Sequence, residues 1–154
     1  MNATAHETCN CSLSQTSLNL SGFKLALSWS CRIVAAIILL QTLYFKFTGA
    51  PESVFIFTKV HMEPWGRYGS GFAELVAAAL LILPRFAWLG AFLAFGIMLG
   101  AIASHLTVLG ISVMDDGGLL FGLALTVLLS SITTLVLHRS QVPFIPYLSK
   151  TKRA

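Results

Sequence analysis

Glu74 stands in the middle of residues 68–83, a run built almost wholly from Ala, Leu, Val, Ile, Phe, Gly and Ser. An ionisable side chain in the hydrocarbon of a membrane costs about 2.5 kcal/mol or more unless it finds a partner or water. A carboxylate at this position therefore needs a partner. It is a candidate for a functional or fold-defining role.

Arg32 is the cation expected to neutralise Glu74. It lies in a second apolar run, residues 25–45. At a rise of about 1.5 Å per residue from the inner helix ends, Arg32 lies about 9 Å deep and Glu74 about 14 Å deep. Either charge alone would be uncompensated in a low-dielectric interior, and an arginine can bind a carboxylate through two parallel hydrogen bonds. The sequence therefore predicts an intramembrane Arg32–Glu74 ion pair.

A second polar group is expected near the opposite, outer ends of the helices. Its members are an acid, bases, an amide and aromatic side chains, which together suit a quinone-like or small polar ligand. The candidate ligand-binding residues are Gln41, Tyr44, Lys46, Glu63, Trp65, Arg67 and His105. Taken singly, Lys46, Trp65 and Arg67 are also typical of anchors at the membrane surface. For His105, a purely structural hydrogen bond is an equal alternative.

The elements that must position these residues are membrane helices. Hydrophobic residues make up 56% of the 154 residues and charged residues 10%, and the mean hydropathy is +0.80. A bilayer core of about 30 Å needs about 20 helical residues. Four stretches qualify, residues 25–45, 65–83, 86–109 and 118–137. The predicted fold is an all-α transmembrane four-helix bundle that occupies residues 25–138.

The connection between the first two spans contains a helix-start signal. Pro51 and Glu52 place a proline and an acid in a first helical turn. Ile56, Phe57 and Val60 then give a short apolar face, which predicts a short interfacial helix.

Small residues recur at four-residue spacing in the second and third spans, a pattern that lets helix backbones approach closely in membranes. The two stripes are expected to pack on each other. They consist of Gly69, Ala73 and Ala77, and of Gly96, Gly100 and Ser104.

The segments outside the bundle suggest an orientation. Residues 1–24 are polar, do not resemble a cleavable signal peptide and predict a disordered cytoplasmic tail; residues 139–154 predict a basic one. The face that bears both termini has six Lys and Arg residues, and the opposite face has three (Lys24, Arg85, Arg139, Lys150, Lys152 and Arg153 against Lys46, Lys59 and Arg67). This bias favours both termini in the cytoplasm. The net charge of +4 then reflects topology, and no nucleic-acid partner is expected.

No metal site is predicted. Cys9 and Cys11 are close enough for a redox or metal-binding pair, but two incidental thiols in a polar tail are the preferred interpretation. Asp115 and Asp116, followed by two glycines, are typical of a turn before a helix.

Several of these segments together resemble one known family. The resemblance is carried by the run Gln41-Thr-Leu-Tyr-Phe-Lys-Phe-Thr-Gly49, then by Pro51-Glu-Ser-Val, Met62-Glu-Pro-Trp-Gly66, Glu74-Leu, the Pro84 turn, and His105-Leu-Thr before an Asp-Gly-Gly turn. It is to the DoxX-like membrane proteins. The resemblance covers roughly residues 32–137. It implies a four-helix bundle in the bacterial inner membrane, in a family whose name comes from subunits of a thiosulfate:quinone oxidoreductase.

The polar residues and the resemblance together leave three functional hypotheses open. The first is a membrane subunit or anchor that binds a quinone or small lipophilic ligand for a redox partner protein, with no cofactor of its own, and that is not a complete oxidoreductase. The second is a small-solute permease or exporter that uses Glu74. The third is a structural or assembly protein with no ligand. The ligand, the partner and the oligomeric state are not specified by the sequence.

Overall fold

Helices account for most of the residues that the structure describes. The structure, a computed structural model, describes the backbone of residues 4–138 and the side chains of residues 22–138. The elements are α1 (Thr4–Thr48), α2 (Pro51–Lys59), α3 (Trp65–Ile82), α4 (Ala87–Ser104), the π-helical turn η1 (His105–Leu109) and α5 (Leu119–Leu137). Residues 4–138 contain no strand, and the predicted all-α class is confirmed for them. The predicted basic tail, residues 139–154, lies outside the described residues.

α1 is longer than the sequence analysis predicts. It begins at Thr4, so the helix continues through residues 4–24, for which a disordered tail is expected. Residues 4–21 contain neither proline nor glycine, and nothing in their backbone chemistry forces a helix to stop there. Polar composition was therefore a poor guide to where α1 begins.

Among the described residues, three stretches are long and apolar enough to cross a membrane, namely Gly22–Thr48, Ala87–Leu109 and Leu119–Leu137. They correspond to three of the four predicted spans. The fourth, α3, does not meet this criterion, and it carries Arg67 and Glu74 within its 18 residues.

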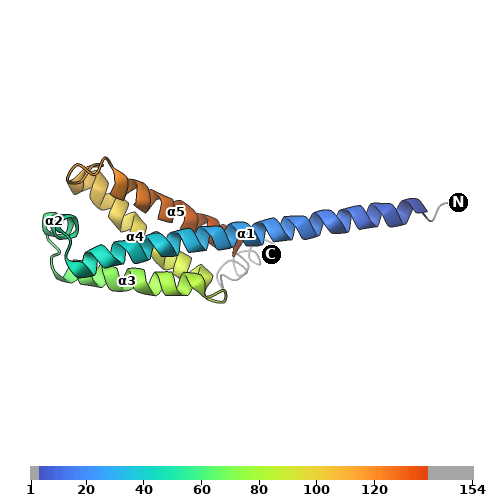
Figure 1. The fold of residues 1–154 in the computed structure, drawn as a ribbon, viewed down its shortest axis with the longest axis horizontal. Helices are drawn as coiled ribbons and strands as arrows, with labels where there is room; N and C mark the ends of the chain where they lie inside the picture. The colour runs from blue at the N-terminus through green and yellow to red at the C-terminus, as the bar shows by residue number, and fades with distance from the viewer. Residues whose placement is uncertain (1–3, 139–154) are drawn as a thin grey trace, which may run out of the picture.

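The four long helices pack side by side, with α3 against both α1 and α4, and α5 against both α4 and α1 (Figure 1). The contact surfaces are dominated by alanine, which lets helix backbones come close in a membrane. Buried core residues include Ala35, Leu39, Ala77, Ala78, Leu81, Ala91, Ala94 and Val127. Large apolar side chains point outward instead, as expected where the surrounding solvent is lipid.

α2 confirms the helix predicted between the first two spans. Pro51 occupies its first turn and Glu52 supplies the acid there. Figure 1 shows α2 lying across the end of the molecule at which α1 ends and α3 begins, and the turn between η1 and α5 lies at this same end. Its predicted position at a membrane surface stays a prediction.

The close approach of α3 and α4 occurs at Gly90, which is not part of the predicted stripe on α4. A Cβ built on Gly90 would lie 2.6 Å from the Leu81 nitrogen and 2.9 Å from the Ala77 carbonyl oxygen. At Gly69, Gly96 and Gly100, a Cβ would meet no atom within 4 Å. The predicted contact between the two stripes is therefore not made at Gly69, Gly96 and Gly100, which face open space, although Ala77 of the first stripe does meet α4, at Gly90.

Candidate functional site

The space left by the small residues is a cavity of about 950 Å³. Residues from every described helix line it, and most of the lining is apolar. Gly69, Gly96, Gly100 and Ser104 all belong to the lining. Small side chains on α3 and α4 thus leave an open space between the packed helices. The volume is in the range of sites that hold small organic ligands.

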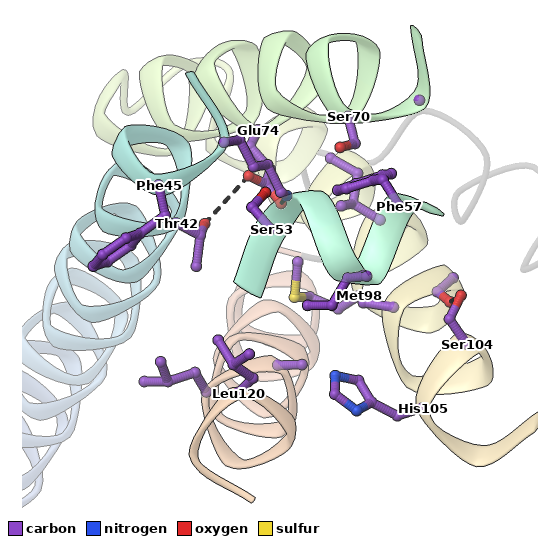
Figure 2. Close-up of a pocket in the computed structure, with 18 of the residues that line it drawn as sticks. Thr42, Phe45, Ser53, Phe57, Ser70, Glu74, Met98, Ser104, His105 and Leu120 are labelled. Carbon is purple, nitrogen blue, oxygen red and sulfur yellow. Dashed lines mark hydrogen bonds and ion pairs between the residues drawn. The ribbon is translucent and has the colours of Figure 1, made fainter. Parts of the chain in front are cut away.

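Glu74 forms the polar end of the cavity with Thr42 and Lys46 of α1; Figure 2 shows Thr42 directed toward Glu74. Its side chain is 2% exposed, and its carboxylate forms a salt bridge with the Lys46 ammonium. Thr42 donates a hydrogen bond to the second carboxylate oxygen at 3.2 Å. Because Thr42 and Lys46 are four residues apart, both side chains leave the same face of α1.

The predicted Arg32–Glu74 ion pair is wrong. Arg32 is buried, but its Nε and Nη2 donate to the carbonyl oxygens of Leu81 and Ile82 at 2.5 and 2.8 Å. The guanidinium therefore satisfies the last carbonyls of α3, where a positive charge is also favoured by the helix dipole. It lies 4.2 Å from the centre of the Trp29 ring. Arg32 fastens α1 to the end of α3 opposite the cavity's polar group.

Ser53 brings α2 to the same polar end. It is 6% exposed, lines the cavity, and its hydroxyl oxygen is buried without a hydrogen-bond partner in the described structure. Buried hydroxyls in proteins are nearly always paired. In the view of Figure 2, Ser53 lies on the same side of the cavity as Glu74, and His105 lies on the other side. A ligand that reached this hydroxyl would not have to break an existing hydrogen bond.

His105 lies at the other end of the cavity, where α4 gives way to η1. Its backbone carbonyl accepts from the Gly110 N–H at 2.8 Å, the five-residue spacing of a π turn. Such turns are frequent at functional sites. The ring is buried, its Nδ1 lies 2.9 Å from the Gly110 carbonyl oxygen, and the Phe121 ring packs edge-on at 5.7 Å. Backbone geometry and packing thus fix the direction of the imidazole.

The other candidate ligand-binding residues divide into two groups. Gln41 and Trp65 line the cavity, although Trp65 is 84% exposed. Tyr44, Glu63 and Arg67 are not part of the lining. Tyr44 points away from the bundle.

Arg67 and Glu63 hold the helix ends together. The Arg67 Nε donates to both Glu63 carboxylate oxygens at 2.9 and 3.1 Å. One Nη of Arg67 donates to the Lys46 carbonyl oxygen. Arg67 thereby ties the end of α1 to the start of α3. It does so at Lys46, the residue whose side chain pairs with Glu74.

Asp116 organises the turn before α5. Its carboxylate accepts hydrogen bonds from the backbone N–H groups of Val113, Gly118 and Leu120 at 2.8–2.9 Å. These bonds, led by that from Leu120, hold the pKa of Asp116 below its usual value. The expected turn is confirmed, and its carboxylate caps α5.

Substituting Asp116 with asparagine is expected to lower the free energy of unfolding by about 1 kcal/mol at pH 7. An amide cannot accept all three bonds. Because the folded-state pKa is depressed, the carboxylate's contribution is complete above the unfolded value of about 4 and is lost as the pH falls through the folded value. Unfolding of both proteins in detergent from pH 7 to pH 3 measures this. A difference that does not shrink below about pH 4 would contradict the capping role.

Three polar residues of the site escaped the sequence analysis, namely Thr42, Ser53 and Ser70, all in the cavity lining. For Thr42 a signal existed, because it is four residues before Lys46 on one helix face. No sequence signal places Ser53 against Glu74. Within the described part of the chain, no group of three or more His, Cys, Asp and Glu residues could hold a metal ion.

Comparison with known proteins identifies one family. The DoxX family model matches residues 28–108, from the buried part of α1 through nearly all of η1. The matched segment therefore contains Lys46, Ser53, Glu74 and His105. No curated protein and no solved structure gives a significant match.

Proposed function

The chain belongs to the DoxX family of membrane proteins, and from that premise we propose that its cavity binds a quinone or another small lipophilic ligand for a redox partner protein. The observation that carries this proposal is the composition of the cavity. An apolar space of about 950 Å³ carries the unpaired Ser53 hydroxyl and the Glu74–Lys46 pair at one end and His105 at the other. Apolar walls with a few fixed polar groups are typical of small-molecule sites.

The chain's proposed role is that of a non-catalytic membrane subunit or anchor. The described residues offer a binding cavity, and the chemistry of electron transfer would be supplied by the ligand and the partner. Quinone is the proposed ligand class because a quinone combines an apolar body with hydrogen-bonding oxygens. These are the two features that the cavity can accommodate.

Four crossings of the bacterial inner membrane, with both termini in the cytoplasm, complete the proposal. α3 packs against α1 and α4, and both of those are long and apolar enough to span. At about 1.5 Å per residue, its 18 residues extend about 27 Å, close to the thickness of the hydrocarbon core. Its charged residues lie against α1 and not against lipid. The excess of Lys and Arg on the terminal face supports the orientation.

Ser53 provides the sharpest test of the cavity as a binding site. Ser53→Ala is expected to weaken binding of decylubiquinone about fivefold, the effect of one hydrogen bond, with no loss of thermal stability. Removing an unpaired buried hydroxyl does not cost the free protein a bond. Equilibrium dialysis in detergent, corrected for partition into empty micelles, measures the affinity.

Ser104→Ala is the matched control, because the Ser104 hydroxyl also lines the cavity but already donates to the Gly100 carbonyl oxygen at 2.9 Å. Its affinity should stay within about twofold of the wild type. Absence of any saturable binding to the wild type would rule out the proposal and favour a structural or assembly role. Lipid extracts of the protein purified from native membranes should contain quinone.

A proton-coupled permease is the second candidate, because the buried carboxylate of Glu74 belongs to the cavity lining. Proton flux into proteoliposomes under an imposed pH gradient should then depend on Glu74 and fall in Glu74→Gln. Equal flux in the two proteins would remove the reason for this candidate.

A further inference from the structure

The hydrogen bond between His105 and Gly110 determines what the cavity can offer a ligand. A carbonyl oxygen can only accept, so the Nδ1 that lies 2.9 Å from the Gly110 oxygen carries the proton. In the neutral ring, Nε2 is then an acceptor. Figure 2 shows the ring directed away from its own helix toward the cavity interior. The side chain is 5% exposed and lines the cavity, so this acceptor is presented to whatever the cavity holds.

Within the part of the chain that the structure describes, no hydrogen bond uses this acceptor. Phe121 packs on the ring with an edge and supplies no polar hydrogen. Asp116, the acid of the cavity lining at this end, has its carboxylate engaged by three backbone N–H groups. A nitrogen acceptor in an apolar space favours ligands that bring a donor and disfavours ligands that turn an oxygen lone pair toward it.

The charges of the cavity indicate a neutral ligand. Lys46 and Glu74 neutralise each other in a salt bridge. Of the two other acids in the lining, Glu52 is exposed and Asp116 is held by backbone N–H groups. A charged ligand would have to compete with that pair and be desolvated in an apolar space. The Ser53 hydroxyl can donate to, or accept from, a neutral polar group equally well.

We infer that the cavity takes a neutral, lipophilic phenol or alcohol whose hydroxyl donates to His105 Nε2, and that of a quinone couple it takes the reduced, hydroquinone form. This inference rests on the proposed function and specifies the redox form of its ligand. A hydroquinone has two donor hydroxyls, whereas a quinone has only carbonyl acceptors. In the oxidised form, a carbonyl oxygen of the quinone would therefore face His105 Nε2, and neither of these two acceptors could supply a hydrogen.

A pair of redox-inert probes tests the hydrogen bond directly. 4-Heptylphenol and 4-heptylanisole share an apolar body, but the methyl ether has no donor. The purified protein is expected to bind the phenol about tenfold more tightly, once each value is corrected for partition into protein-free micelles. Under argon, decylubiquinol should likewise bind about tenfold more tightly than decylubiquinone.

His105→Phe separates ligand recognition from structure. It keeps a ring against Phe121 and removes the acceptor, so the preference for phenol over anisole and for the reduced quinone should vanish while the affinity for decylubiquinone is retained. Ser53→Ala, at the other end of the cavity, should weaken both forms of the quinone alike, because each has a second oxygen, and should leave the preference for the reduced form intact.

The outcomes distinguish the inference from the proposed function. Equal binding of phenol and anisole by the wild type, or equal losses for both forms of quinone in His105→Phe, overturns the inference and leaves a quinone site standing. If none of the four probes binds, the proposed function fails and the inference fails with it. If His105→Phe does not fold, the comparison of phenol and anisole binding to the wild type still tests whether the cavity prefers a ligand with a donor hydroxyl.

Discussion

Lys46→Met is expected to lower the free energy of unfolding by about 3–5 kcal/mol. The substitution keeps the length and apolar stem of the side chain but removes the ammonium from Glu74. That carboxylate is 2% exposed and would retain a single hydrogen bond, from Thr42 at 3.2 Å. A buried charge without its counterion carries most of its desolvation cost uncompensated. Unfolding by sodium dodecyl sulfate in mixed micelles, followed by circular dichroism, measures the loss.

Double substitutions show whether Lys46 acts through Glu74. Lys46→Met combined with Glu74→Leu should recover most of the loss, because a buried ion pair replaced by apolar groups of similar size is often neutral or stabilising. Arg32→Met combined with Glu74→Leu should be additive within about 0.5 kcal/mol, since Arg32 binds carbonyl oxygens of α3. Coupling of Glu74 to Arg32 in place of Lys46 would contradict the observed pairing.

The sequence was a good guide to residues that had to be neutralised but not to their partners. Burial of Glu74 follows from its apolar neighbours, and the need for a cation follows from burial. Depth along the membrane then made Arg32 the expected partner. Depth gives the position of a residue along the membrane normal only, whereas pairing also depends on which face of α1 meets α3. Arg32 found unpaired carbonyls at the end of α3, and Lys46 reached Glu74 from the other end of α1.

The hollow in the bundle could not be predicted from local patterns. A glycine stripe has the same sequence whether it touches another backbone or leaves a space. Gly90 touches the backbone of α3, whereas Gly96 and Gly100 leave a space. The difference depends on where helices diverge, which is decided by the whole set of contacts. Ser53 illustrates the same limit, because α2 was predicted correctly while its position over Glu74 depends on the fold of the connection.

Gly90→Ala is expected to lower the free energy of unfolding by about 3 kcal/mol, the upper part of the range for overpacked cores. The new methyl group would lie 2.6 Å from the Leu81 nitrogen and 2.9 Å from both the Ala77 oxygen and the Leu80 carbonyl carbon. All three are backbone atoms of α3, so no side-chain rotation relieves the clash and the two helices must separate. Arg32 binds the same end of α3, which restricts that movement further.

Gly96→Ala is the matched control on the same helix. No atom lies within 4 Å of its added methyl group, and alanine is the better helix former by about 1 kcal/mol. The same chemical change should therefore stabilise α4 at one position and destabilise the bundle at the other. Thermal unfolding of both variants in one detergent compares them directly. Equal effects at the two positions would mean that α3 and α4 do not meet at Gly90, and the cavity between them would lose its geometric basis.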